Sequence, residues 1–310
     1  MTHGVVERAL TGAGGANAAL RRAIVRTVAY ADLFDYPLDR TEIHRYLIGH
    51  PASSVEIDAM LERDGALGTF LERTGDRFHL RGRASTVVTR RTREAASAGL
   101  WRAARVYGAW ISRLPLVRFV GVTGALAMSN ADRDADIDLF VLTHPRRLWL
   151  CRLLVLVVVR LAALRGHRLC PNFLLSTEQL TLGERNLFTA HEITQMVPLH
   201  ATEWYAHFID ANRWTLDHLP NTLRGRGGSA RADNALTGFA TRLLATPLFA
   251  PLERWEMRRK IRRLAARGAR EGGGSLAFSE VECRGHFAAH DVRVLAAYAA
   301  RAAVMEAQLE

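Results

Sequence analysis

The sequence predicts an α+β fold, in which a small mixed β-sheet is flanked by an N-terminal module of short helices and a C-terminal helical region. Three observations predict it. Two short runs rich in apolar and β-branched residues, 117–123 and 136–143, indicate buried strands. Residues 18–83 contain three helical patterns followed by two short extended runs. From residue 183 onward, helical patterns dominate.

These patterns divide the chain into four segments. Residues 1–17 are small and glycine-rich, so we expect them to be flexible. Residues 18–83 form the N-terminal domain, and residues 84–182 form a core that opens with a long helix over 84–111. Residues 183–310 form the helical region. The helices expected there cover 183–196, 201–218, 236–249, 251–268 and 285–308.

The N-terminal domain is predicted to contain three helices and a hairpin. A helical pattern runs from Ala18 to the break at Pro37, and a second ends at Gly49. The third begins near Ser53 or Ser54, a suitable N-cap, and the hairpin turns around Thr74-Gly75-Asp76. This order is typical of a winged helix.

The charge of the third helix of that domain argues against DNA recognition by this domain. It carries four acids against a single arginine, and an acidic recognition helix repels the phosphates that supply most non-specific affinity. We therefore expect the domain to be a scaffold or a protein-contact unit. The charged residues concerned are Glu56, Asp58, Glu62, Asp64 and Arg63.

The core domain is predicted to alternate strands with short helical segments. After the strand at 117–123, the letters GALAMSN form a short helical turn before the strand at 136–143. A buried helix follows over Leu148–Leu164, and a third strand covers 168–176. Pro171 in that third run suggests an edge strand or a strand start.

The net charge of +11 is distributed unevenly. Arg81–Arg118 carries nine arginines against Glu94, and Arg254–Arg270 carries eight basic residues against Glu256. Each segment would attract a nucleic acid, although a solvated helix face is the favoured explanation of each one taken singly.

The sequence also predicts a cytoplasmic protein with no membrane partner. Three cysteines are too few for a disulfide framework, and the N-terminus lacks the apolar core of a signal peptide. Arg152 and Arg160 interrupt the run Leu148–Leu164, leaving far fewer than the roughly 20 apolar residues that a bilayer requires.

An alternating row of aspartates leads into the second predicted strand, in the stretch TGALAMSNADRDADIDLFVLT. A calcium loop fails because Ile137 stands at its glycine position and Thr143 at its final glutamate position. A dinucleotide fingerprint fails because the glycine spacing is wrong and the connection to the next strand is short. The four acids are Asp132, Asp134, Asp136 and Asp138.

The third interpretation of the aspartates rests on Thr123-Gly124-Ala125, ten residues, and then Asp136-Ile137-Asp138-Leu139. This pattern resembles the nucleotidyltransferase superfamily to which DNA polymerase β belongs, over about residues 117–176. The whole layout is similar to a bacterial group with an N-terminal winged-helix-like region and a C-terminal helical region. The resemblance implies Mg²⁺ (or Mn²⁺) at Asp136 and Asp138, and a nucleoside triphosphate such as ATP held near Gly124, Ala125 and Ser129.

Elementary chemistry supports that pairing of acids. Mg²⁺ is a hard cation that takes carboxylate, water and phosphate oxygens. Two acids at i and i+2 of a strand project to the same face, so one ion can bridge Asp136 and Asp138. Gly124 would let the backbone approach phosphate closely. Asp132 and Asp134 lie upstream and are expected to be solvated turn residues.

Two departures from the family pattern leave the function open. Ala125 replaces the usual serine; Ser129 is the candidate substitute one turn later, although a helix-end role is favoured for it. The third strand carries no acid; Asn172 stands near the expected place, and Asn cannot act as a base at neutral pH. Glu178 and Glu192 are candidates only by their proximity in sequence.

Two functions therefore remain at this stage. The first is an enzyme that transfers a nucleoside monophosphate to a hydroxyl acceptor on a small molecule, a protein or an RNA end. The second is a nucleotide- or nucleic-acid-binding regulator that keeps the fold without the third acid.

Overall fold

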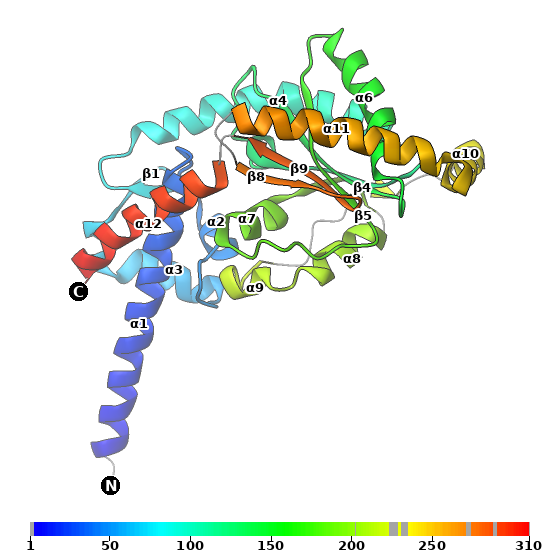
Figure 1. The fold of residues 1–310 in the computed structure, drawn as a ribbon. Helices are drawn as coiled ribbons and strands as arrows, with labels where there is room; N and C mark the ends of the chain where they lie inside the picture. Colours follow the sequence, from blue (N-terminus) through cyan, green and yellow to red (C-terminus); the bar gives the residue numbers. More distant parts are fainter. Residues whose placement is uncertain are drawn as a thin grey trace. The chain divides into compact units, whose positions relative to one another are not determined.

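The computed structural model describes residues 3–201, 203–222, 229–230, 235–270, 274–287 and 290–309. It has a mixed α+β architecture with a small mixed sheet, as predicted (Figure 1). The chain divides into two compact units. The first comprises Met1–Thr92, Trp214–Leu223 and Val294–Glu310, and the second comprises Arg93–Arg213 and Arg224–Arg293.

The first unit contains the predicted succession of helices and hairpin. Helices α1 (His3–Asp32), α2 (Arg40–Arg45) and α3 (Ser54–Arg63) precede the strands β1 (Leu71–Thr74) and β2 (Arg77–Leu80). The two strands pair in antiparallel fashion. The order agrees with the prediction, whereas α1 begins much earlier than the expected Ala18.

Local capping explains the short helices of this unit. Asp39 and Glu42 form a reciprocal capping box at the start of α2, and Ser53 and Glu56 form another at the start of α3. The predicted N-cap at Ser53 is thereby confirmed. The short helices η1 (Gly65–Thr69) and α9 (Thr215–His218) also belong to this unit.

The second unit is built on a sheet of seven described strands in the order β7-β6-β3-β4-β5-β9-β8. The central strand β4 pairs antiparallel with β3 and parallel with β5, and β5 pairs antiparallel with β9. The strands are β3 (Val117–Val122), β4 (Ile137–Thr143), β5 (Leu169–Ser176), β6 (Val197–Ala201), β7 (Ser229–Ala230), β8 (Gly274–Phe278) and β9 (Glu282–Phe287).

Helices pack on both faces of the sheet. On one face, Val120, Leu139 and Val141 are fully buried in a cluster that includes residues of α4 (Ser85–Ser112) and α6 (Leu148–Ala163). Helix α11 (Ala250–Arg270) packs against α6 (Figure 1).

The opposite face of the sheet is aromatic. The ring of Phe119 stacks on Tyr205 with centroids 5.0 Å apart, and the ring of Phe140 lies 4.8 Å from that of Phe208. Both partners come from α8 (Glu203–Ala211), so the aromatic residues there serve as core.

The C-terminal region corrects the sequence prediction. Helices α7 (Leu187–Gln195), α8, α9, α10 (Ala235–Ala245), α11 and α12 (His290–Leu309) are present, but strands interrupt them. The sheet includes β6, β7, β8 and β9, all from the region expected to be helical. In consequence, β5 is not an edge strand, because Phe173, Leu174 and Leu175 pair with β9. Pro171 lies before that paired stretch, near the start of β5 as the alternative interpretation allowed.

No single described helix is long and apolar enough to cross a membrane. The segments Ala235–Ala245 and Pro247–Arg263 pass the same criterion only when they are taken together, and they are bent by 63° relative to each other.

Candidate functional site

Asp136 and Asp138 lie together at the start of β4. Asp136 immediately precedes the strand and is exposed, whereas Asp138 is its second residue and is partly buried. Burial, followed by the negative charge of Asp136, raises the pKa of Asp138 to about 7. The two carboxylates are therefore close enough to repel each other, as expected for side chains at i and i+2 of an extended segment.

Gly124 provides the bend that brings the chain back to these acids. The short helix α5 (Gly124–Ala127) follows β3 directly, and Gly124 has a φ of 64°. A Cβ at this position would lie 2.5 Å from Asp138 Oδ2, a distance that no side chain could occupy. Both the backbone conformation and the neighbouring carboxylate thus require glycine here.

The other residues predicted around phosphate lie further along the same bend. The carbonyl of Ala125 accepts hydrogen bonds from the amides of Met128 and Asn130. The hydroxyl of Ser129 accepts a hydrogen bond from the indole Nε1 of Trp101 in α4 at 3.1 Å. Ser129 therefore has a structural contact, and its role toward phosphate stays a prediction.

Strand β5 places polar groups against both aspartates. The amide Nδ2 of Asn172 donates to Asp138 Oδ1 at 3.1 Å, and the Cys170 thiol also hydrogen-bonds that carboxylate. Asn172 Oδ1 is buried and has no hydrogen-bond partner in the described part of the chain. The Nε atom of Arg168 lies 2.7 Å from Asp136 Oδ1. A register shift between β4 and β5, next to Asp138, accompanies this placement of Asn172.

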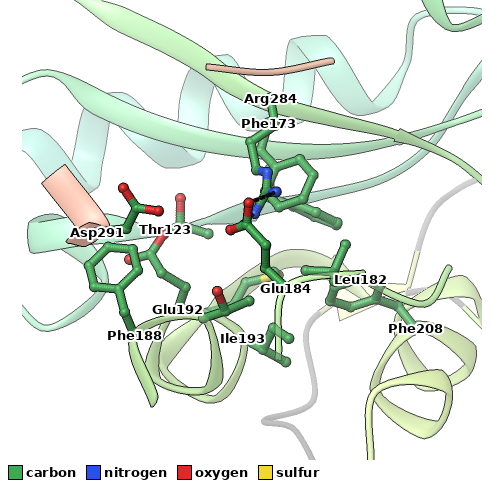
Figure 2. Close-up of a pocket in the computed structure, with 13 residues that line it drawn as sticks. Thr123, Phe173, Leu182, Glu184, Phe188, Glu192, Ile193, Phe208, Arg284 and Asp291 are labelled. Carbon is green, nitrogen blue, oxygen red and sulfur yellow. Dashed lines mark hydrogen bonds and ion pairs between the residues drawn. The ribbon is translucent and has the colours of Figure 1, made fainter. Parts of the chain in front are cut away.

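Helix α7 brings a further acid close to the aspartate pair. Asn186 caps the helix by accepting from the amide of Thr189, and Glu192 projects from it into a small pocket that Thr123 also lines. Figure 2 shows the carboxyl group of Glu192 directed towards Thr123. Burial, followed by the charge of Asp138, raises the pKa of Glu192 to about 7. Glu192 is therefore an electrostatic neighbour of the aspartate pair.

A fourth carboxylate lines the same pocket. Asp291 stands in the first turn of α12, is 6% exposed, and lies beside Glu192 and Phe188 (Figure 2). Its Oδ1 has no hydrogen-bond partner among the residues that the structure describes. No signal in the sequence distinguished Asp291, because an acid in the first turn of a helix is common on electrostatic grounds alone.

Of three remaining acids, two are engaged elsewhere and one is exposed. Asp132 is exposed and pairs with Arg93 at 3.1 Å, and Asp134 is exposed at the turn before β4. Glu178 accepts from the amide and the side chain of Arg146. We therefore give Glu178 no part in the site.

The donor chemistry of the site suits Mg²⁺ without forming a complete protein cage. Among the described residues, no group of three or more His, Cys, Asp and Glu side chains is arranged to hold a metal ion. Asp136, Asp138 and the free Oδ1 of Asn172 offer only hard oxygen ligands. Mg²⁺ is commonly bound by one or two carboxylates with water and substrate phosphates completing the shell, so this donor set fits.

Comparison with known protein families, with curated proteins and with solved structures finds no match. The resemblance to nucleotidyltransferases thus stays a prediction that depends on the glycine bend and the paired aspartates.

Proposed function

We propose that this chain is a nucleotidyltransferase-like enzyme that moves a nucleoside monophosphate from a triphosphate to a hydroxyl acceptor. The observation that carries the proposal is the contact between the Asp138 carboxylate and the Gly124 bend, with Asp136 beside it. A structural aspartate would be paired with a cation of the protein. Asp138 instead faces a second acid and a backbone bend with no room for a side chain.

Each residue of the site has a role in this proposal. Asp136 and Asp138 would hold Mg²⁺, which when bound supplies positive charge to the phosphates and offsets the charge that develops during transfer. Gly124 would leave space for phosphate oxygens next to the backbone. Asn172 orients the Asp138 carboxylate through its amide, and this positioning role explains an asparagine on β5.

Glu192 is the residue that we propose for the missing acid. It reaches the site from α7 rather than from the next strand, and no hydrogen bond to another described residue occupies its carboxylate. A carboxylate in this place would accept the proton of the attacking hydroxyl. The acceptor itself is identified only by class, as a hydroxyl of a small molecule, a protein or an RNA end.

One observation favours the alternative of a nucleotide-binding regulator. Arg168 pairs with Asp136, and Asn172 occupies the strand position where a third acid is expected. Such an arrangement would bind a nucleotide and its cation while lacking a base close to the reacting phosphate. The two functions differ in turnover and not in binding.

An assay of transfer and binding with matched variants separates these functions. The protein is incubated with each triphosphate labelled at the γ-phosphate, with Mg²⁺ or Mn²⁺ and candidate acceptors, and release of labelled pyrophosphate is measured. We expect Asp136→Asn and Asp138→Asn to abolish release, with losses of about 10²–10³-fold or more. Asp134→Asn, which changes an exposed carboxylate on the same segment, is the matched control and should keep full activity.

Titration calorimetry with the same variants completes the test. Cation-dependent triphosphate binding that Asp138→Asn removes, without turnover in the parent protein, would select the regulator. If the parent protein binds no triphosphate in the presence of either cation, both functions are wrong.

A further inference from the structure

The segment from α10 to α11 exposes a row of large apolar side chains. Helix α10, the short helix η2 (Pro247–Phe249) and the first turns of α11 carry them. Two examples are Phe239, which is 65% exposed, and Leu248, which is 77% exposed. We call this row the apolar ridge; it consists of Leu236, Phe239, Leu243, Leu248, Leu252 and Trp255.

Core packing does not account for the ridge, because other positions of the same helices fill the core. Leu244 of α10, Phe249 of η2, and Met257 and Ile261 of α11 pack against the buried cluster of the second unit. Ridge residues on α10 recur at i, i+3 and i+7, and those on α11 at i and i+3, which is the spacing of a single helix face. Each helix therefore has two apolar faces, of which one packs against the cluster and the other is exposed.

The exposed charge beside the ridge has a single sign. Between residues 235 and 263 the acids are Glu253 and Glu256, which are 8% and 1% exposed. Both oxygens of Glu253 accept the backbone amides of Trp149 and Leu150, at 2.8 Å each. Basic residues of the same segment are exposed; they are Arg242, Arg254, Arg258, Arg262 and Arg263.

We infer that the apolar ridge and the arginines beside it bind the surface of a membrane that contains anionic lipids. Apolar side chains would enter the boundary between headgroups and acyl chains, while the arginines contact lipid phosphates and carboxylates. Arg259 lies over the ring of Trp255 at 5.1 Å, and this pairing of an aromatic ring with a cation suits the headgroup region.

The geometry favours a segment that lies on the membrane over one that spans it. Helices α10 and α11 are separated by a bend of 63°, and neither one alone meets the criterion for a membrane span. The sequence predicts no membrane partner, and it identifies Arg254–Arg270 as a segment that would attract a nucleic acid. A nucleic acid would use the arginines but would gain nothing from exposed leucines such as Leu248 and Leu252, so lipid is the better match.

Vesicle sedimentation with the full chain tests the inference, which does not depend on the proposed enzymatic function. We expect binding to vesicles of phosphatidylcholine with phosphatidylserine, weaker binding to phosphatidylcholine alone, and a decrease with salt. Phe239→Ser combined with Leu248→Ser should abolish binding. Val55→Ser, which removes a side chain that is 74% exposed on α3, is the matched control and should bind as the parent does.

A second pair of variants tests the charge. Arg258→Gln combined with Arg262→Gln should weaken binding to the anionic vesicles about tenfold or more. Circular dichroism and thermal melting of every variant should match the parent, since all of these side chains are exposed.

Three outcomes would overturn the inference. The first is failure of the folded parent protein to bind anionic vesicles. The second is binding that survives the two apolar substitutions and is displaced by tRNA, which would assign the surface to nucleic acid. The third is a concentration-dependent dimer that Leu248→Ser disrupts and that vesicles do not compete with, which would assign it to a second copy of the chain.

Discussion

Buried charge is treated in opposite ways in the first unit and at the candidate site of the second unit. In the first unit, Arg90 donates to both carboxylate oxygens of Glu42, at 2.7 and 2.9 Å, and also to the carbonyl of Pro37. Asp32 accepts from Arg83 and from Arg301. Every one of these carboxylates is neutralised by arginine, as a structural ion pair must be when water is excluded.

At the candidate site of the second unit, Asp138 and Glu192 interact with each other and not with an arginine. Asp138 contacts the neutral side chains of Asn172 and Cys170, and it raises the pKa of Glu192 by its own charge. In the described part of the chain no arginine pairs with Asp138 or Glu192, although Arg168 pairs with the neighbouring Asp136. Acids that the protein does not neutralise destabilise its fold, and groups with perturbed pKa values cluster at functional sites. The contrast separates a structural network from a candidate site.

Loss of Arg90 should have the largest effect on stability. The Arg90 guanidinium is the main partner of Glu42 and also lies 4.0 Å from the ring centroid of Tyr36. In Arg90→Met, the partly buried carboxylate of Glu42 loses that main partner. We expect the free energy of unfolding to fall by about 3–5 kcal/mol in a urea titration. The control is Arg91→Met, which changes an exposed arginine next in sequence and should shift stability by less than about 0.5 kcal/mol. Equal losses in both variants would show that the Arg90 network is not structural.

Gly124→Ala should have an intermediate effect, and it should affect the site as well. A left-handed backbone at alanine costs about 1–2 kcal/mol, and the new Cβ would displace the Asp138 carboxylate. Gly166→Ala is the matched control, because its φ is 77° and nothing lies within 4 Å of the added atom. Both variants should lose similar stability, while only Gly124→Ala should lose triphosphate binding. If both variants lost triphosphate binding, the loss would not be specific to the Gly124 bend, and the bend would not belong to the site.

The smallest predicted effect is a gain in stability. Because the pKa of Asp138 rises from 3.8 to about 7, the folded protein keeps this proton to higher pH than the unfolded chain does. Parent stability should therefore decline as pH rises between those values, and Asp138→Asn should lack that decline. Without divalent cations above pH 7, the variant should be more stable than the parent protein.

Thermal melting across pH measures this difference, with Asp134→Asn as the control that should follow the parent protein. Addition of Mg²⁺ should stabilise the parent and leave Asp138→Asn unchanged. If the stability of the parent protein rose through the same pH range, Asp138 would not be an acid that lacks a positively charged partner in the protein.

Local patterns in the sequence predicted the elements around the site. The strands at 117–122 and 137–143 and the helices α4 and α6 fall within a few residues of their expected bounds, because apolar periodicity and β-branched runs determine them locally. The proximity of Gly124 to Asp138 was expected from the spacing of the two motifs in the resemblance, and the structure brings the two residues together.

The parts of the fold and of the site that the sequence did not predict depend on contacts between residues far apart in the chain. Strands β8 and β9 carry no β-branched run, and tertiary pairing with β5 makes them extended. Glu192 and Asp291 enter the site because α7 and α12 start beside the aromatic face of the sheet, which no spacing in the sequence encodes. Two acids at i and i+2 form a pattern that can be recognised in the sequence, whereas an acid that reaches the site from a distant helix forms no such pattern.

The pairing of β5 with β9 has a consequence for how the protein is made. Ser176 leaves the ribosome long before Glu282, so the outer edge of β5 has its neighbour only late in translation. At about 5–20 residues per second, the roughly 100 intervening residues take on the order of 5–20 s. During that interval an apolar strand presents unpaired backbone groups to other nascent chains, and a chaperone that shields it would raise the yield of native protein.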